Sequence, residues 1–313
     1  MMKIMPAVRE QAVLEGTLPG ELQEMLQNVS EYGNPMGESP RKRVRWTKDL
    51  EQPPRDLSKE DGSESVEVLW YVSDYYAYHG RGNDAARALT RVFNRLEVDF
   101  GILGTLEKCD GDSQRLVGET GLFEELAQHN DEQFQKYKHG TLVVTDPHAF
   151  NAFKNHYPKV TGNEYRVAHY TQYLSNRLKE LKPLLVKPYE KKLTFHDPCY
   201  LGRHNGEYQA PRDLVVAIPG AEFMEMYRCR EQSYCCGGGG GGMWLDGVSA
   251  DHTRERLSEN RVREAVEIGA EVLVVCCPYE VSRFEDAVKS TDNEGKLEVR
   301  DIAEILDYCM DGV

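Results

Sequence analysis

The sequence of 313 residues lacks several features that would define its class at once. It has no apolar run near the roughly 18 residues of a membrane span, and its first residues hold no continuous apolar core of a secretory signal. None of its eight cysteines forms a CxxC pair, so a zinc ribbon or thioredoxin site is poorly supported. We expect a cytoplasmic protein whose cysteines bind metal, act in catalysis or fill the core.

The sequence also has fewer basic than acidic residues. The chain has 38 Lys and Arg against 52 Asp and Glu, a net charge of −14, which argues against a nucleic-acid partner. One basic segment, PRKRVRW at residues 40–46, departs from this trend, and we interpret it as solvated or partner-facing. A hydrophobic content of 40% over this length allows a substantial core and two domains.

Short apolar runs alternate with amphipathic stretches from Val66 onward. Examples are VEVLWYV followed by DAARALTRVFNRLEV, and AEVLVVC followed by PYEVSRFEDAV. This alternation is typical of an α/β fold with a mainly parallel sheet. Residues 1–30 have helical periodicity, whereas 31–66 are rich in Pro, Gly, Ser and charge, and within them EQPPRDLSKEDGSESVE, beginning at Glu51, predicts an exposed linker.

Three pairs of segments reveal an internal duplication. WYVSDYY resembles FHDPCYL, EKCDGD resembles SYCCGG, and VVTDPHAF resembles VVCCPYEV, at nearly constant offsets. The pattern therefore predicts two tandem repeats of a mainly parallel sheet flanked by helices. We predict a partner-binding helical and linker extension at 1–66, a degenerate first repeat at 67–185 and a second repeat at 186–313 that carries the functional site.

The matched positions follow strands or lie in loops, where α/β folds place ligands at the carboxyl ends of strands. The second repeat carries four cysteines at these positions: Cys199, Cys235, Cys236 and Cys277. The first repeat carries Asp74, Cys109, Asp110 and Asp146 instead. Those aspartates either cap helices and turns or form a polar pocket facing the cysteine site.

The cysteines of the second repeat suit a soft metal, because thiolates favour iron–sulfur centres, zinc or copper. Adjacent cysteines fit poorly around a single zinc ion, whereas a cluster accepts them at different irons. The glycine run after Cys236 has three possible interpretations: a linker, a phosphate loop, or a loop whose amides donate to cluster sulfides. Its flanks, Cys235 and Trp244, are residues that are usually buried, and no Lys-Ser or Lys-Thr follows the run.

Three motifs carry a family resemblance: Cys199, the CCG at Cys235 to Gly237, and the Cys277-Pro278 pair. With them, the chain resembles the cysteine-rich CCG domain of the B-type subunit of heterodisulfide reductase. Relatives of that subunit include one in the sulfur-oxidising heterodisulfide-reductase-like complex. The resemblance covers about residues 67–290 as two repeats. It implies a noncubane [4Fe-4S] cluster, held by five cysteines in the complete motif, that reduces or forms disulfides.

This chain departs from the family motif at its end. The motif closes with CxxC, but Glu280 stands at the last position and Cys276 precedes the motif. The resemblance therefore implies one cluster per chain, either a four-cysteine cubane or a noncubane form completed by Glu280, by Cys276 or by nothing. Gly237, Gly238 and Gly239 are the expected cofactor-binding glycines, and no cluster is expected in the first repeat.

The resemblance also implies a function and partners. We expect disulfide, thiol or persulfide chemistry, with Glu280, His196 and Arg203 as candidate catalytic residues. The expected partners are a ferredoxin-like C-type subunit, a flavin-containing A-type subunit, and a small sulfur compound or lipoyl carrier as substrate. The alternative is a non-catalytic electron-transfer or scaffold subunit that carries a cubane cluster.

Overall fold

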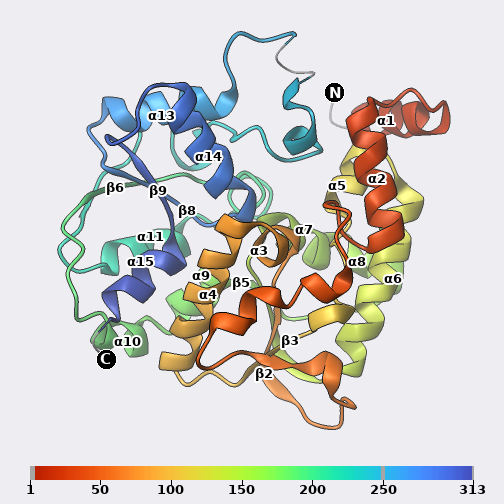
Figure 1. Cartoon of the computed structure of the whole chain (residues 1–313), viewed down its shortest axis with the longest axis horizontal. Coiled ribbons are helices and arrows are strands. Elements are labelled where there is room, and N and C mark those ends of the chain that lie inside the picture. The colour runs from red at the N-terminus through yellow and green to blue at the C-terminus, as the bar shows by residue number, and fades with distance from the viewer. Residues whose placement is uncertain (1–3, 248–250, 312–313) are drawn as a thin grey trace.

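Two parallel β-sheets organise the chain, in a computed structural model that describes residues 4–247 and 251–311 (Figure 1). The first sheet has the order β1-β3-β2-β4-β5, and the second has the order β7-β6-β8-β9. All neighbouring strands are parallel. The strands are β1 (Arg55–Asp56), β2 (Val66–Tyr71), β3 (Phe100–Ile102), β4 (His139–Val144), β5 (Val167–His169), β6 (Lys192–Phe195), β7 (Glu222–Phe223), β8 (Val272–Val275) and β9 (Glu298–Asp301).

The two sheets repeat one topology. When β2 to β5 are matched in sequence order with β6 to β9, the strand orders of the two sheets coincide, apart from the added edge strand β1. The central strands β4 and β8 end in continuous buried apolar runs, as parallel strands covered on both faces do. The predicted fold class, a duplicated α/β fold with mainly parallel sheets, is confirmed.

Helices follow the strands in the expected alternation. The first repeat contains α3 (Asp74–Tyr78), α4 (Gly80–Arg95), α5 (Asp112–Val117), α6 (Thr120–Lys136), α7 (Pro147–Asn155), α8 (Tyr157–Thr161), α9 (Tyr170–Asn176) and α10 (Leu178–Leu181). The second repeat contains α11 (Gln209–Ala217), α13 (Leu257–Glu267), α14 (Pro278–Ser290) and α15 (Ile302–Cys309). Helices α7 and α14 occupy equivalent places, directly after β4 and β8.

The repeats pack against each other through helices. In Figure 1, α15 lies beside α4 and α14 lies above α3, and the structure places these pairs in contact. Arg81 of α4 joins the repeats by ion pairs with Glu285 of α14 and Glu304 of α15, each at 2.7 Å. One hydrophobic core includes side chains from both sheets, such as Val143 and Val274.

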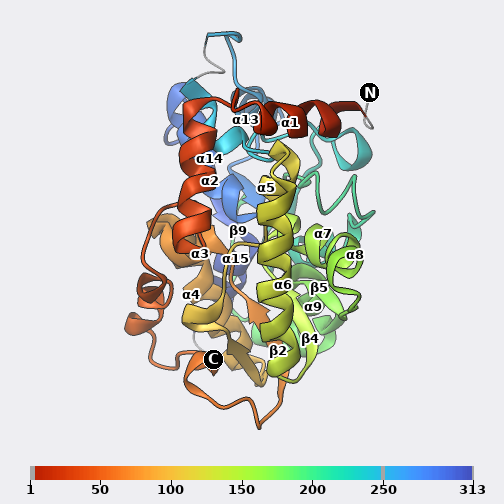
Figure 2. The same cartoon turned by 90° about the vertical axis from the view of Figure 1, so that its right-hand side faces the viewer.

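The N-terminal segment forms part of the folded unit. It contains α1 (Ile4–Leu14) and α2 (Gly20–Tyr32), and α2 runs alongside α5 and α6 in Figure 2. Leu22, Met25 and Val29 of α2 share a buried cluster with Val117 and Leu126. The predicted helical character is confirmed for residues 4–30, and residues 1–3 lie outside the described part of the chain.

The predicted exposed linker, EQPPRDLSKEDGSESVE at 51–67, is wrong in its centre. β1 pairs with β3 at the edge of the first sheet, and Leu57 is buried in the core, because strand pairing satisfies the backbone of this polar segment. The basic segment 40–46 is also only partly solvated. Arg43 and Trp46 are buried against the first repeat, whereas Arg41 and Arg45 are exposed.

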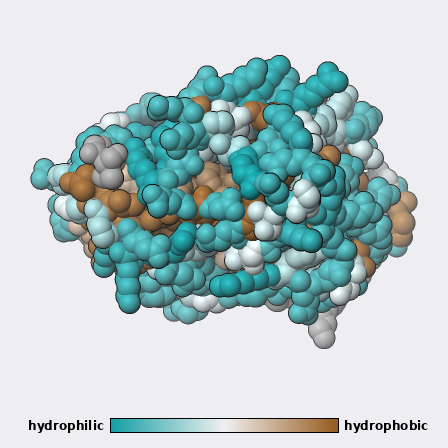
Figure 3. Space-filling view, turned by 90° about the horizontal axis from the view of Figure 1, so that it is seen from below, coloured by the Kyte–Doolittle hydropathy of each residue, from teal (hydrophilic) through white to brown (hydrophobic). Residues whose placement is uncertain are grey.

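The surface drawn in Figure 3 is mostly hydrophilic, with apolar patches toward its left and right edges. Such scattered exposure of apolar groups is normal for a folded protein. Within residues 4–247 and 251–311, none of the helices has the length and apolar character needed to cross a membrane.

Candidate metal centre

Loops at the carboxyl ends of the second sheet carry the cysteines. Cys199 follows β6, Cys235 and Cys236 lie in the long loop after β7, and Cys277 follows β8. Parallel strands end at the same edge of a sheet, so these loops converge there. Cys277 is also the N-cap residue of α14, which places it at the start of a helix of 13 residues.

The thiols of Cys199, Cys235 and Cys236 form one electrostatic group. Hydrogen bonding from Cys199, and then from Cys236, lowers the pKa of Cys235 far below its usual range. The same interaction with Cys235 raises the pKa of Cys199 and of Cys236. One thiolate shared among neighbouring thiols is a typical arrangement for soft-metal ligands.

The glycine run is an ordered loop that wraps this group. The backbone N–H of Gly237 donates to Cys235 Sγ at 3.2 Å, and that of Gly238 donates to Cys236 Sγ at 3.4 Å. The run then folds back on itself: a Cβ added to Gly242 would lie 2.2 Å from the carbonyl oxygen of Gly237. A side chain at Gly242 is therefore excluded by close backbone approach within the loop, which a flexible linker would not require.

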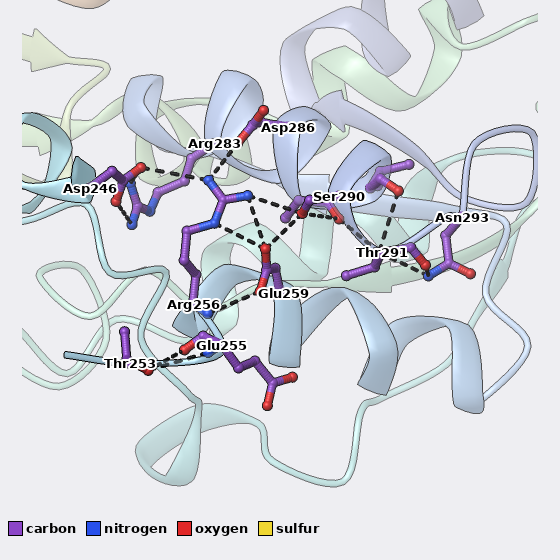
Figure 4. A network of polar contacts seen from close by, with 12 residues as sticks. Asp246, Thr253, Glu255, Arg256, Glu259, Arg283, Asp286, Ser290, Thr291 and Asn293 are labelled. Atoms are coloured by element: carbon purple, nitrogen blue, oxygen red, sulfur yellow. Dashed lines mark hydrogen bonds and ion pairs between the residues drawn. The ribbon is translucent and has the colours of Figure 1, made fainter. Parts of the chain in front are cut away.

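Arg283 of α14 fastens both ends of the glycine loop. Its Nε donates to the Cys236 carbonyl at 2.7 Å, and its guanidinium pairs with Asp246 at 2.9 Å. Figure 4 shows this pair beside Arg256, which joins Glu259 and Asp286 to the same network. The loop that carries the adjacent cysteines is thus held by α14, the helix whose N-cap position is occupied by Cys277.

A buried relay of polar side chains reaches the thiols from α13. Arg261 Nε donates to His196 Nδ1 at 3.2 Å, and His196 Nε2 lies 3.2 Å from Glu280 Oε1. Because an arginine can only donate, Nδ1 is an acceptor and the imidazole proton is on Nε2, directed at Glu280. Burial lowers the pKa of His196 well below its usual value, and the positive charge of Arg261 adds to the effect.

Glu280 has a carboxylate oxygen whose hydrogen-bonding capacity is not satisfied. Its Oε2 is buried and has no hydrogen-bond partner among the described residues. Burial, and then the charge of Cys235, raise its pKa well above the usual value. One ligand atom each from His196, Cys236 and Glu280 lies within 4.8 Å of the others, which is close enough to share a metal ion.

These observations fit a bound metal group. The donors are thiols with one carboxylate, two amides already donate to sulfur, and a buried carboxylate oxygen lacks a partner among the described residues. Soft sulfur donors of this kind suit an iron–sulfur centre or zinc better than a hard cation. The adjacent pair Cys235 and Cys236 favours a centre with several metal atoms over one tetrahedral zinc.

The equivalent positions of the first repeat have become structural. Asp146 caps α7 by accepting from the His148 backbone N–H at 2.8 Å, and Asp110 accepts from the Asp112 N–H at 2.7 Å. Asp74 forms an ion pair with Arg43, which also pairs with Glu107 at 2.6 Å. These carboxylates make the caps, turns and pairs that one interpretation of the sequence expected.

The other candidate residues differ in where they lie relative to the thiols. Cys276 is fully buried in the main core, on the face of β8 that carries Val274, so we leave it out of the proposed ligand set. Arg203 is exposed and donates to the Ser233 carbonyl at 2.9 Å, and its charge acts to lower the pKa of the nearby Cys199. Gly239 makes no contact with a cysteine sulfur among the described hydrogen bonds.

Several residues at the site carried no signal in the sequence. Arg261 and Arg283 lie in amphipathic helices, where a buried arginine cannot be told from an exposed one. His148 could have been found, because the duplication aligns it with Tyr279, and both turn out to line the junction of the repeats.

The chain combines a duplicated parallel α/β fold with cysteines in the loops at the carboxyl ends of the second sheet. Residues 70–154 and 193–279 match the model of the CCG family, described as "Cysteine-rich domain". The chain belongs to this family. The recognised resemblance to CCG-domain proteins is thereby confirmed.

Curated relatives share the same segment. The chain is 35% identical over 97% of its length to "Probable iron-sulfur-binding oxidoreductase FadF" of Bacillus subtilis and 36% identical over 99% to "EtfAB:quinone oxidoreductase" of Syntrophomonas wolfei. It spans 43% of each of these proteins. It is also 32% identical to one of the subunits of "Dihydromethanophenazine:CoB--CoM heterodisulfide reductase" from Methanosarcina barkeri, covering 97% of this chain and 72% of that protein.

Proposed function

We propose that the chain holds one iron–sulfur cluster on Cys199, Cys235, Cys236 and Cys277 and acts in an oxidoreductase of the heterodisulfide-reductase type. The observation that carries the proposal is a buried group of donors in the second repeat, where ligand atoms of Cys236, His196 and Glu280 lie within 4.8 Å of one another. Cys235 hydrogen-bonds with Cys199 and Cys236, and Glu280 Oε2 has no partner among the described residues. The names of the relatives, which include iron–sulfur and heterodisulfide reductase proteins, agree with it.

The proposed reaction is thiol, disulfide or persulfide chemistry. A cluster of this kind, when bound, supplies single electrons and an iron to which substrate sulfur can bind. The chain's own contribution is positional: the glycine amides donate to the cysteine sulfurs, and Arg283 keeps the loop closed. The Arg261 and His196 relay directs an N–H at Glu280 Oε1, while Oε2 has no hydrogen-bond partner among the described residues.

Glu280 gives the proposed site its open position. A fifth cysteine would close the ligand set with a strong thiolate, whereas a carboxylate binds iron less tightly and can be displaced by sulfur. In the proposal, Glu280 either occupies this position weakly or withdraws to His196. Arg203, exposed beside Cys199, is available to bind an anionic part of the substrate.

The number of electrons in the proposed reaction implies a partner subunit. Reducing a disulfide takes two electrons, so a site that exchanges one at a time needs an electron-transfer partner. We propose a ferredoxin-like C-type subunit for this role and a flavin-containing A-type subunit behind it. The substrate would be a small sulfur compound or a lipoyl carrier.

The test starts from protein purified without oxygen. Iron and acid-labile sulfide are measured for the wild type, for Cys236→Ala and for Cys309→Ala, a buried cysteine at the end of α15 away from the site. We expect about four irons per chain in the wild type and Cys309→Ala, and loss of iron in Cys236→Ala. Zinc without sulfide would overturn the proposal.

Low-temperature electron paramagnetic resonance then separates the two functions. A thiol-dependent signal in the wild type that changes in Glu280→Cys, which restores the CxxC spacing, supports catalysis at an open position. A signal indifferent to thiol in both proteins favours the alternative, a subunit that only transfers electrons. Glu280→Gln serves as the shape-matched control.

A further inference from the structure

Aromatic side chains of the two repeats contact one another across the junction in a nearly symmetric arrangement. Tyr75 follows Asp74 in the first repeat as Tyr200 follows Cys199 in the second, and His148 and Tyr279 occupy equivalent positions two residues after Asp146 and Cys277. Tyr75 contacts Tyr279 at a ring distance of 5.0 Å, and Tyr200 contacts His148 at 4.0 Å. Each repeat therefore places one tyrosine, Tyr75 or Tyr200, against the first turn of the helix that follows the central strand of the other.

His148 is the member that breaks this symmetry, since it is an imidazole where the other repeat has a phenol. Its Nδ1 lies 2.8 Å from Asp112 Oδ2, and Arg115 pairs with the other oxygen of Asp112 at 2.6 Å. His148 and Asp112 are both buried. A buried carboxylate pointed at Nδ1 sets the orientation of the ring and keeps a proton on Nδ1.

The opposite edge of the imidazole faces the glycine loop. A Cβ added to Gly239 would lie 2.9 Å from His148 Nε2 and 2.8 Å from Cε1. His148 thus lies against Gly239, three residues after Cys236, and against Tyr200, the residue after Cys199. Its ring also meets Tyr279 edge to face at 5.7 Å. The first repeat, which lacks the cysteine set, places a histidine beside three ligand-bearing segments.

The charges around His148 favour its protonated form. Burial opposes the charge, but the hydrogen bond and charge of Asp112, with the charges of Asp146 and Asp110, raise its pKa to about 9. On the other elements packed here, Arg115 is neutralised by Asp112, and His204 lies beyond Tyr200 with its pKa lowered by burial. Tyr200 and Tyr279 have pKa values raised by burial and stay neutral.

We propose that the His148 imidazolium is the counter-charge of the metal site and couples its reduction to the binding of a proton. The inference rests on the proposed function. When one electron enters from an added reductant, the positive charge offsets the added negative charge. Where His148 starts neutral, one proton from solvent binds at Nε2 at the same time, because Nδ1 already carries the proton shared with Asp112.

The experiment is a redox titration of the anaerobically purified protein with dithionite, followed by electron paramagnetic resonance, at a series of pH values. Four proteins are compared: the wild type, His148→Gln, Asp112→Asn and His204→Gln. His204 is the matched control, because it stacks on Tyr200 at 4.2 Å but is exposed and has no carboxylate partner among the described residues. Iron content and melting temperature are measured for each.

In the wild type, we expect the midpoint potential to begin falling with pH near 9, the pKa of His148. His148→Gln should lower the midpoint potential at neutral pH and abolish the break, which is the pH at which the potential begins to fall. Asp112→Asn should keep the break but move it to lower pH, toward the ordinary imidazole value of 6.5, a shift that a merely structural defect would not produce. His204→Gln should match the wild type.

The outcomes separate this inference from the proposed function. A wild-type protein without iron and sulfide overturns both. A wild-type protein with a cluster whose potential and break are unchanged in His148→Gln, or whose break does not move in Asp112→Asn, overturns the role of His148 alone. If His148→Gln loses its iron, the Asp112→Asn shift still decides the question.

Discussion

Arg43 is a charged residue that the fold buries against the first repeat. It pairs with Asp74 and with Glu107, and Glu107 also accepts the backbone N–H groups of Val72 and Ser73 at 3.0 Å. Burial raises the pKa of Glu107 to about 7, and the charge of Arg43 opposes that rise. The ion pairs therefore tie the segment before β1 to the loop after β2.

Arg43→Met should be strongly destabilising, because it leaves Asp74 and Glu107 buried without a cation. We expect the free energy of unfolding to fall by about 3–5 kcal/mol. Arg41→Met, on the exposed side of the same segment, should change it by less than about 0.5 kcal/mol. Denaturation in urea measures both, and equal effects would show that Arg43 is not part of the core.

The pair of His148 and Asp112 predicts a pH-dependent stability. The folded pKa of His148, about 9, lies above its ordinary value of 6.5, so its contribution is complete below about 6.5 and is lost as pH rises through 9. The pKa of Asp112 is lowered, so the carboxylate is charged throughout this window. The shift corresponds to about 3 kcal/mol.

His148→Gln should therefore be less stable than the wild type by about 3 kcal/mol at pH 6, and the difference should shrink as the pH passes 9. Urea denaturation at both pH values provides the measurement. A difference that stays constant across this range would assign the loss to packing against Tyr200 rather than to the ion pair.

At the scale of elements, the equivalent helices α7 and α14 differ in the residue at their N-cap position. Asp146 caps α7 through its side chain, whereas Cys277 at the same place on α14 makes no side-chain cap. A carboxylate satisfies the free N–H groups of a helix start, and a thiol does so poorly. The first repeat thus has a capped helix where the second has a free thiol.

The glycine loop is the element most sensitive to small changes. Gly242→Ala would place a Cβ 2.2 Å from the Gly237 carbonyl oxygen, so the backbone that positions Cys235 and Cys236 must shift. We expect a loss of about 1–3 kcal/mol of stability and of most of the bound iron. Gly247→Ala, with no atom within 4 Å of the added Cβ, is the matched control and should retain iron. Equal iron contents would contradict this account.

At the scale of the molecule, the second repeat depends on the first. Its glycine loop packs on Leu22 of α2 and Val117 of α5 at Gly241, and its ligand loop stacks on His148 at Tyr200. The two sheets also share one core. The folded environment of the cysteines is therefore built from both halves of the chain.

Residues 186–313 expressed alone should aggregate and hold little iron, because these surfaces would be exposed. Co-expression with residues 1–185 should restore a stable complex with iron. Size-exclusion chromatography with iron analysis distinguishes the cases, and a monomeric second repeat with full iron content would show that it folds independently.

Much of the architecture was predictable from periodicity and duplication. Alternating apolar runs and amphipathic stretches predicted the parallel α/β fold, and the repeated motifs predicted which loops meet, because parallel strands end at one edge. The gathering of Cys199, Cys235 and Cys236 with Glu280 follows from this. The exposed linker at 51–67 was mispredicted in its centre, since composition does not show that β1 pairs with an existing sheet edge.

By itself, the sequence determined the repeated fold and the strand-end loops that carry the thiols, since both depend on local periodicity and chain order. Only the tertiary structure decided which side chains turn toward those thiols. It placed Cys276 in the core by the alternation of β8, and it brought Arg261 to His196 and Asp112 to His148. Such contacts join residues distant in the chain, and they depend on side-chain direction and burial, which no local pattern records.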